Sequence, residues 1–176
     1  ISTGVRSYRG YAWIVGTALP PHRPGGVLVR AVRRDRANAT DRVAARLEGS
    51  PFRDHVQAVL LDGIALAGLD VIDLCGLAER LARPVLALTR EASDLAAIRR
   101  AREARVPGGA RDGRRIERAG PMEPIEGVWV RRAGLRAAAA ARLLGDARVQ
   151  GLLPDPIRLA PLITGALARG RSRGGA

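Results

Sequence analysis

An α/β domain built on a mixed sheet is the fold class that the sequence predicts. Two apolar segments, residues 11–19 and 27–32, come first and are separated by a turn rich in Pro and Gly, as in a β-hairpin. Short apolar runs and amphipathic stretches then alternate along the rest of the chain, which is typical of strands that are joined by helices. At 176 residues, the chain is long enough to bury a substantial core.

The first half of the chain contains the hairpin, a helix and a buried strand. The run over 11–19 is rich in β-favouring residues and is stopped by two prolines. The helix predicted over 39–47 has its apolar residues at helical spacing, and Asn38 is a candidate N-cap. Residues 58–61 form a continuous apolar run, as in a strand that is buried on both faces.

Helices and strands continue to alternate in the second half. Apolar periodicity predicts a helix over 71–81, a strand over 84–89 and a helix from Ser93 to Arg105. The Gly- and Arg-rich segment 107–115 is expected to be mobile.

Three elements complete the predicted domain. They are a strand over 128–131, an alanine-rich helix over 137–144 and a last helix that begins near Pro156. We therefore expect one domain over residues 1–168, followed by a flexible tail of Arg and Gly over 169–176.

The chain is strongly basic, with a formal net charge of +13 and a pI near 11.6. All 30 basic residues are arginine, whose planar fork suits phosphate better than the ammonium group of lysine does. This predicts a polyanionic partner, of which nucleic acid is the simplest. The alternative is that a GC-rich coding sequence explains the arginines, but such a bias does not explain their excess over the acids.

Several classes of protein lack support in the sequence. The apolar runs are too short for a transmembrane helix and no signal peptide is visible, so no membrane partner is expected. The glycine spacing of phosphate-binding loops and the Gly-x-Ser-x-Gly motif of serine hydrolases do not occur. Cys75 is the only cysteine, which we expect to be a buried, unreactive thiol in a cytoplasmic protein. His22 and His55 have no metal-ligand neighbours at helical spacing, so we expect both on the surface.

A carboxylate at the end of the buried strand is the strongest candidate for a functional site. Asp62 and Gly63 follow the apolar run directly, and open sheets bind ligands at the carboxyl ends of their strands. Asp62 is therefore either a site residue or a cap on the next segment. Asp35, at the exit of strand 27–32, is a second candidate. Carboxylates placed in this way can hold Mg²⁺, which activates water and stabilises charge on a phosphate.

Two further polar residues lie near the predicted strand ends. Arg90 follows the strand over 84–89 and is expected at the same edge as Asp62, where a guanidinium can bind a phosphate. The alternative is an ordinary surface arginine in an arginine-rich chain. Asp73 follows Asp62 closely and is either a further acid of the site or a residue that favours the positive start of a helix.

Several stretches together resemble the archaeal endonuclease dU family, which is related to endonuclease V. The sequence from Leu61 to Asp73 is similar to the Leu-Asp-Gly-Ile block of that family and to the Gly-Phe-Asn-Val-Val-Asp block that follows it. The sequence from Leu153 to Ala160 resembles the Ile-Pro-Glu-Pro-x-Arg-Leu-Ala block that the family shares with endonuclease V. The resemblance covers residues 11 to about 172.

The resemblance implies a ribonuclease H-like fold and a magnesium-dependent endonuclease of DNA repair, which cuts DNA near a deaminated base. Deoxyuridine is the expected lesion. Asp62 and Asp35 match family positions that would ligate the metal, and Arg90 falls where endonuclease V carries a catalytic lysine. Arg90 and Arg158, the arginine of the last block, are the residues implied to contact nucleic acid.

The chain also departs from the family pattern. The first strand of the family ends in an aspartate, whereas residues 1–10 contain no acid, so this ligand lies upstream of Ile1 or is lost. Because the chain does not begin with methionine, we expect residues upstream. Asn38 stands where the family often has a second acid, and Pro161 replaces a histidine.

Three functions therefore remain open. The first is the nuclease, the second is a non-catalytic nucleic-acid-binding domain on the same fold, and the third is a role without nucleic acid. DNA is the expected partner and RNA is the alternative. The sequence does not indicate an oligomeric state.

Overall fold

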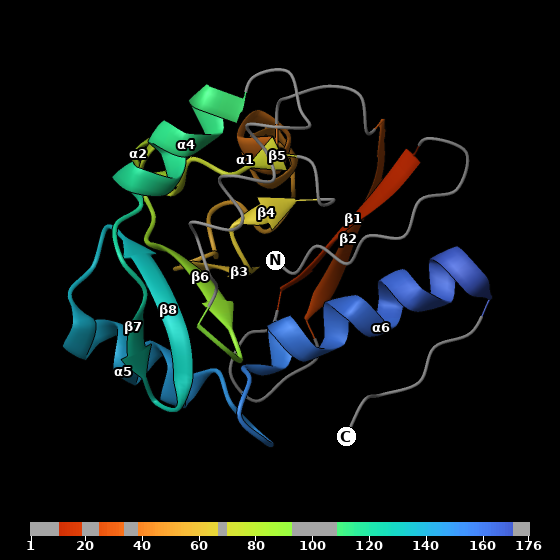
Figure 1. Cartoon of the computed structure of the whole chain (residues 1–176). Coiled ribbons are helices and arrows are strands. Elements are labelled where there is room, and N and C mark those ends of the chain that lie inside the picture. Colours follow the sequence, from red (N-terminus) through yellow and green to blue (C-terminus); the bar gives the residue numbers. More distant parts are fainter. Residues whose placement is uncertain (1–10, 19–24, 34–38, 67–69, 93–108, 171–176) are drawn as a thin grey trace.

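Four strands form the main sheet, in the order β3-β6-β8-β7 (Figure 1). The structure is a computed structural model that describes residues 11–18, 25–33, 39–66, 70–92 and 109–170. The strands are β3 (Val59–Asp62), β6 (Val85–Thr89), β8 (Val128–Ala133) and β7 (Glu123–Ile125). Because β3 and β6 are parallel, whereas β8 is antiparallel to β6 and to β7, the sheet is mixed, as predicted.

The predicted hairpin forms a separate two-stranded sheet. Strands β1 (Tyr11–Ala18) and β2 (Gly26–Arg33) are antiparallel and in full register. A Cβ atom at Gly26 would lie 2.0 Å from Cζ of Phe52, so any larger residue here would have to displace that ring. A third, small sheet pairs β4 (Ala65–Leu66) with β5 (Asp70–Val71).

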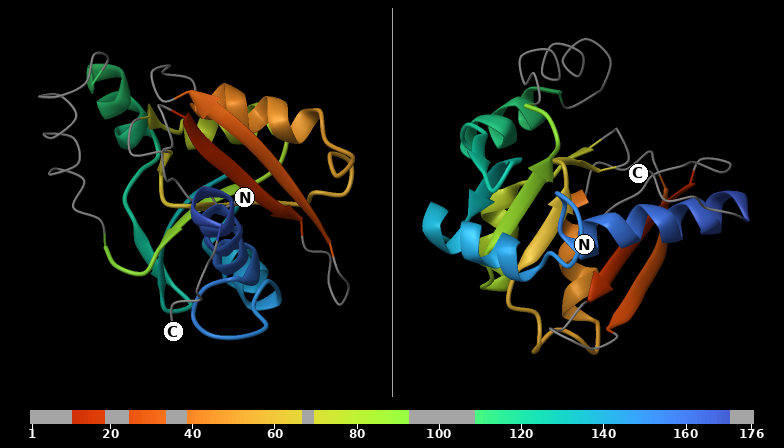
Figure 2. Two further views of the ribbon diagram at one scale, coloured as in Figure 1. Left: turned by 90° about the vertical axis from the view of Figure 1, so that its right-hand side faces the viewer. Right: turned by 90° about the horizontal axis from the view of Figure 1, so that it is seen from below.

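Helices cover both faces of the main sheet (Figure 2). One face carries α1 (Ala39–Glu48), α2 (Leu74–Leu81) and α4 (Gly109–Arg118). The other carries α5 (Ala137–Asp146) and the first turns of α6 (Asp155–Arg169), which continues along β1. The helices expected over 39–47, over 137–144 and from Pro156 are thus confirmed.

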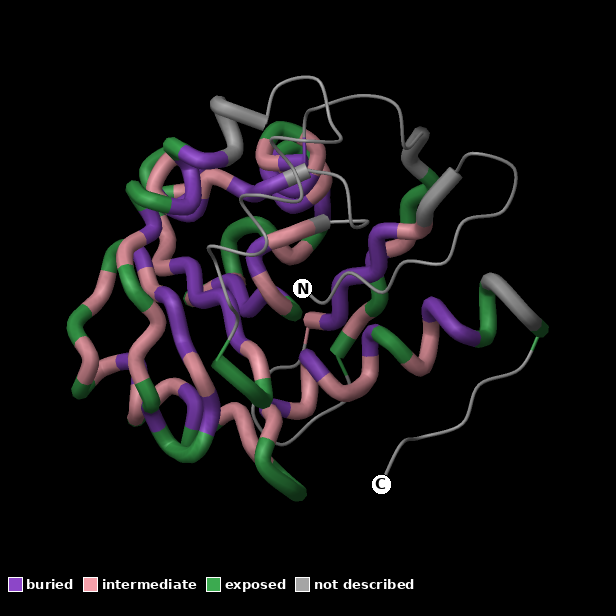
Figure 3. The backbone as a smooth tube through the Cα atoms, in the orientation of Figure 1, coloured by how far each residue is buried: buried purple, intermediate pink, exposed green. Residues whose placement is uncertain are grey.

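The apolar residues of the edge strand β3 and of its neighbour β6 are buried on both faces of the sheet (Figure 3). Leu61 and Ala87 pack with α1 and α2, whereas Leu60, Leu86 and Leu88 pack with α5 and α6. Each such leucine contributes about 2 kcal/mol by leaving water. The continuous apolar run before Asp62 is therefore a doubly covered strand, as predicted.

One prediction of local structure was wrong, and a second placed the start of a helix too early. The segment 107–115 was expected to be mobile, but α4 spans Gly109–Arg118 because Ile116 enters the core and Arg115 donates to the carbonyl of Val71 (2.8 Å). The helix expected over 71–81 begins only at Leu74, since the preceding residues pair with β4. The predictions for Asn38 and for residues 93–105 fall outside the described residues, as does most of the tail expected over 169–176, although Arg169 still belongs to α6.

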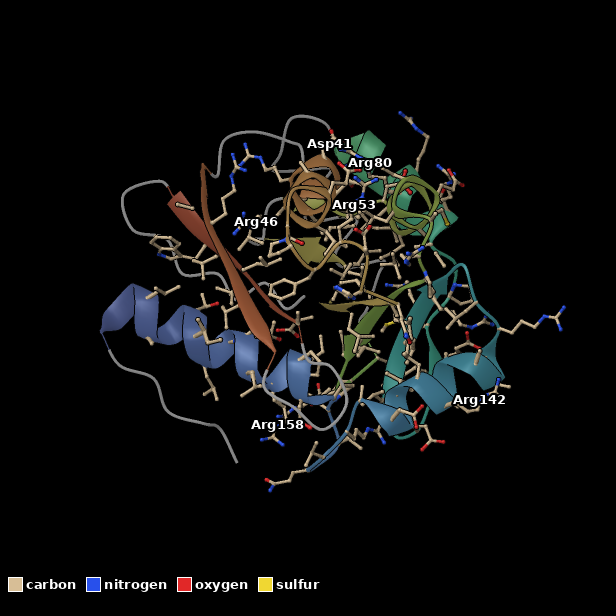
Figure 4. All side chains as sticks on the ribbon, turned by 180° about the vertical axis from the view of Figure 1, so that it is seen from behind. Asp41, Arg46, Arg53, Arg80, Arg142 and Arg158 are labelled. Atoms are coloured by element: carbon tan, nitrogen blue, oxygen red, sulfur yellow. The ribbon has the colours of Figure 1, made fainter. Side chains whose placement is uncertain are left out.

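Two ion-pair clusters join the helices on the α1–α2–α4 face. Arg80 of α2 donates to Asp41 (3.0 Å) and Glu48 (2.7 Å) of α1, and Figure 4 shows Arg80 and Asp41 together. The hydrogen bond from Arg80 lowers the pKa of Glu48 below its usual value. On the other side of α2, Arg118 pairs with Asp73 (3.3 Å) and Glu79 (2.9 Å).

Arg131 is a charged residue inside the domain. It is 2% exposed, and its Nε–H donates to the carbonyl of Gly120 (2.8 Å). No described carboxylate pairs with it, and burial lowers the pKa of its guanidinium below the usual value. The loop after α4 is thereby tied to β8.

Three smaller observations complete the fold. Cys75 is half-buried rather than buried, and its thiol lies 3.5 Å from the carbonyl oxygen of Arg118. His55 is exposed, as predicted, whereas His22 falls outside the described residues. Among the described helices, none has the length and apolar character needed to cross a membrane.

Candidate active site

Asp62 ends β3 with its side chain exposed. It lies opposite Leu88 in the parallel pair of β3 and β6, and the N–H of Gly63 donates to the carbonyl of Leu88 (2.9 Å). Gly63 then turns the chain with a φ of +78°, which glycine adopts without strain. The Asp62 carboxylate thus stands at the carboxyl edge of two parallel strands, where sheets of this kind bind ligands.

Arg90 follows β6 directly at the same edge. It is exposed, and the register puts it two residues beyond Leu88, the partner of Asp62. The Thr89 hydroxyl donates to the carbonyl of Glu91 (2.6 Å), which orders the turn that carries Arg90. The structure therefore brings Asp62 and Arg90 to one edge of the sheet, as the sequence predicted.

The first turn of α6 lies on the face of the sheet to which Asp62 belongs. Side chains alternate along β3, so Asp62 shares the face of Leu60, which packs with Ile157 of α6. The guanidinium of Arg158 donates to the carbonyl of Gln150 (2.7 Å) and pairs with Asp155 (3.3 Å). Figure 4 shows Arg158 at the start of α6, where its guanidinium stabilises the preceding loop through the bond to Gln150.

Asp73 is a helix cap. Its carboxylate accepts from the N–H of Gly76 (2.9 Å) as the N-cap of α2, and its own N–H donates to the Thr40 hydroxyl (3.0 Å). The structure therefore supports the interpretation of Asp73 as a residue that stabilises the start of a helix.

The described residues supply part of a metal site. They include no group of three or more His, Cys, Asp or Glu side chains that could hold a metal ion. Asp35, the second predicted ligand, falls outside the described residues. The exposed carboxylate of Asp62 suits Mg²⁺, which keeps several waters and needs only one or two protein carboxylates. Of the two predicted ligands, Asp62 is therefore the one that the described residues place at this edge, and its carboxylate is of the kind that magnesium prefers.

The sequence analysis missed other residues at this edge. Glu91 is an exposed acid directly after Arg90, and its position behind a strand was a signal for it. The turn of Glu126 and Gly127 between β7 and β8 also lies here, because Trp129 is opposite Thr89 at the end of β6. The apolar residues Val149 and Leu152 are exposed beside that turn.

The sequence of this chain matches a known protein family over most of its length. The family model described as Endonuclease dU matches residues 2–168. This chain belongs to the Endonuclease dU family.

Members with similar sequences occur in several organisms. A UPF0215 protein of Deinococcus radiodurans is 44% identical over 169 residues, which cover 96% of this chain and 86% of that protein. A UPF0215 protein of Methanothermobacter thermautotrophicus is 30% identical over 172 residues, which cover 96% of this chain and 79% of that protein. The Endonuclease dU family resemblance seen in the sequence is thereby confirmed.

Solved structures show the same fold. A protein of unknown function from Archaeoglobus fulgidus superposes with a TM-score of 0.88 at 22% identity and covers 94% of this chain and 95% of its own. Human ENDOV has a TM-score of 0.57 at 13% identity over 96% of this chain and 83% of its own. Ciona intestinalis endonuclease V was solved with a 24mer DNA that contains an inosine. It has a TM-score of 0.59 at 11% identity and covers 96% of this chain and 85% of its own. The predicted ribonuclease H-like fold is confirmed for this member of the Endonuclease dU family.

Proposed function

We propose that the protein is a magnesium-dependent endonuclease that cuts DNA near deaminated bases, with deoxyuridine as the expected lesion. The observation that carries this proposal is the joint position of Asp62 and Arg90 at the sheet edge of a chain in the Endonuclease dU family. The DNA bound to Ciona intestinalis endonuclease V, which shares the fold, further supports nucleic acid as the substrate.

The residues at the sheet edge would have separate roles in metal binding and phosphate binding. Asp62, with Asp35 as the second candidate, would hold the magnesium ion. When bound, such an ion polarises a phosphoryl oxygen and lowers the pKa of a coordinated water. Arg90 binds and orients the phosphate with paired N–H donors. Arg158 contributes positive charge while it holds the loop before α6.

A pocket for the damaged base would complete the specificity. An enzyme that acts beside one base has to take that base out of the stack and read its edge. Aromatic residues make up only 3% of this chain, so extensive stacking on aromatic rings is unavailable. Apolar and polar side chains at the sheet edge must therefore provide the recognition.

A second candidate is a non-catalytic nucleic-acid-binding domain. The observation that favours it is that the described residues contain no ready-made cluster of metal ligands. In such a domain, the arginines would hold phosphates without any hydrolysis.

Cleavage assays separate the two candidates. Labelled duplexes that contain deoxyuridine, inosine or no lesion would be incubated with the protein in Mg²⁺ and in EDTA, beside matched RNA strands. The nuclease is expected to cut the deoxyuridine strand in Mg²⁺ only. Binding without a magnesium-dependent cut on any strand would instead support the non-catalytic domain.

A salt titration tests whether nucleic acid is the partner. Phosphate contacts release counterions, so affinity should fall steeply between low and moderate salt. An affinity that hardly changes would favour a role without nucleic acid.

A further inference from the structure

The connection between α5 and α6 presents apolar side chains to solvent. We call residues 148–152 the 148–152 loop. Val149 is 82% exposed and Leu152 is 48% exposed. Single exposed apolar residues are common on protein surfaces, so exposure alone says little about function. What distinguishes these two is the way in which the loop is held.

Hydrogen bonds from the start of α6 fix the loop backbone. The N–H of Val149 donates to the carboxylate of Asp155 (2.6 Å), and the N–H of Asp155 donates to the carbonyl of Ala147 (3.0 Å). Arg158 donates from one turn further along to the carbonyl of Gln150 (2.7 Å). Side chains of one helix, α6, therefore hold the backbone of the first part of the loop, at Val149 and Gln150.

A second anchor ties the loop to the sheet. The guanidinium of Arg148 donates to the carbonyl of Glu126 (2.6 Å) and lies 3.9 Å from the carboxylate of the same residue. A Cβ atom at Gly127 would lie 2.8 Å from Cδ1 of Leu152, so this leucine leans on the turn between β7 and β8. Because that turn precedes β8 at the end where β6 finishes, the loop stands at the same sheet edge as Asp62.

A braced loop holds its apolar tip in one place. The carboxylate of Asp155 accepts from the N–H of Val149 and pairs with Arg158, and the carboxylate of Glu126 lies near Arg148. Val149 is branched at Cβ, which restricts its side chain to few rotamers. An apolar group that is stiff, exposed and next to a nucleic-acid site is suited to press against a base face, as the apolar wedges of DNA-bending proteins do.

We propose that Val149 and Leu152 form an apolar wedge that contacts base faces of the nucleic acid and unstacks a neighbouring step. This inference rests on the proposed function, since it takes nucleic acid as the ligand. It goes further by assigning to the 148–152 loop a role in distorting the strand beside the site of Asp62.

The geometry also says where the distortion falls. Strands β3 and β8 are separated by β6, so they are about 10 Å apart at the usual spacing of paired strands. Successive nucleotides of one strand of a duplex rise about 3.4 Å along the axis. Because about 10 Å corresponds to about three such steps, the wedge should act at least about three nucleotides from the phosphate at Asp62.

A fluorescent base analogue tests the wedge. 2-Aminopurine brightens when it loses its stacking neighbours, so it would be placed singly at each of the five nucleotides on either side of a deoxyuridine. EDTA would prevent cleavage during the measurement. The anisotropy of a second dye on the DNA would measure affinity, and the 2-aminopurine fluorescence would measure unstacking. The wild-type protein is expected to give a rise of at least twofold at a restricted set of positions.

The chain offers a matched control. Val149→Ser with Leu152→Ser removes the wedge, whereas Val27→Ser with Leu167→Ser changes an exposed valine and leucine elsewhere, which are 50% and 44% exposed. Since all four side chains are exposed, both variants should keep the melting temperature of the wild type. The wedge variant is expected to lose at least half of the rise at saturating protein, and the control to keep it.

The outcomes are distinguishable. A wedge variant that binds and brightens the probe as the wild type does would overturn the wedge and leave the proposed function standing. A control variant that loses the rise equally would also overturn it. A wild-type protein that fails to bind DNA even at low salt would overturn the proposed function and the wedge together.

Discussion

Asp62 and Arg90 stand at one edge of the sheet because Asp62 lies opposite Leu88, two residues before Arg90 on the neighbouring strand. Arg90 begins the turn after β6, so its backbone lies beyond that of Leu88 at the end where the two parallel strands finish. A phosphate that is bound by Arg90 would therefore lie on the side of the edge where the carboxylate of Asp62 is exposed. This offset leads to separate predictions for the two residues.

Asp62→Asn is expected to remove cleavage while leaving DNA binding intact. The amide keeps the size of the side chain but lacks the charge that suits Mg²⁺, so the magnesium-dependent rate should fall at least about a hundredfold. Rates and affinities would be measured on the same deoxyuridine duplex. Asp54→Asn, at an exposed carboxylate in the turn before β3, is the matched control and should keep the wild-type rate. Equal rates for Asp62→Asn and the wild type would remove Asp62 from the site.

Arg90→Gln is expected to weaken binding to every DNA sequence by a similar factor. The change removes one phosphate contact, so the slope of log K against log salt should become shallower by about 0.9. Arg53→Gln changes an exposed arginine before β3, at the opposite end of that strand, and should keep the wild-type slope. If both variants change the slope equally, Arg90 has no particular place in the complex.

Arg131 offers a test of a buried charge. Arg131→Met keeps most of the side-chain volume and loses the bond to Gly120, but it also removes a guanidinium that pairs with no described carboxylate. We expect the free energy of unfolding to stay within about 1 kcal/mol of the wild type, because replacing buried charges by apolar groups is often neutral. Arg131→Ala leaves a cavity and should be about 2–5 kcal/mol less stable than Arg131→Met. Urea denaturation would measure both, and a strongly unstable Met variant would show that the charge itself is needed.

The pair of Arg80 and Glu48 should make stability depend on pH. The hydrogen bond from Arg80 lowers the pKa of Glu48 in the folded protein, from an ordinary value of 4.5. The contribution is therefore present above about pH 4.5 and is lost as the pH falls through the lower, folded pKa. Because both groups are at the surface, Glu48→Gln should lower Tm by no more than a few degrees at neutral pH. The Tm difference from the wild type should shrink as the pH falls below 4.5, and a difference independent of pH would contradict the assignment.

Local sequence patterns were sufficient for most of the sheet. The run of Val59, Leu60 and Leu61 is buried on both faces, and a continuous apolar run of this length indicates such a strand. The turn at Gly63 was also predictable, since a glycine after a strand-end carboxylate is a signal for a change of direction. The common edge of Asp62 and Arg90 followed from the parallel pairing that alternating strands and helices imply.

Tertiary contacts explain what local patterns missed. The segment that forms α4 contains glycines that disfavour a helix, and it is stabilised by Ile116 in the core and by the bond from Arg115 to Val71. The start of α2 depends on Asp73 as a cap and on the pairing of β4 with β5, which is too short to leave a periodic pattern. The 148–152 loop has no sequence pattern at all, because its course depends on bonds from Asp155 and Arg158.

In the connection between α5 and α6, the residues that fix the backbone differ from the residues that present side chains to solvent. Arg148, Asp155 and Arg158 hold the chain through its backbone, whereas the side chains of Val149 and Leu152 make none of those bonds. Mutations at Val149 therefore leave these backbone bonds in place, whereas a mutation at Leu152 also removes its contact with the turn at Gly127. In evolution, such a loop can exchange its tip residues, and with them a preference among substrates, while the fold is inherited intact.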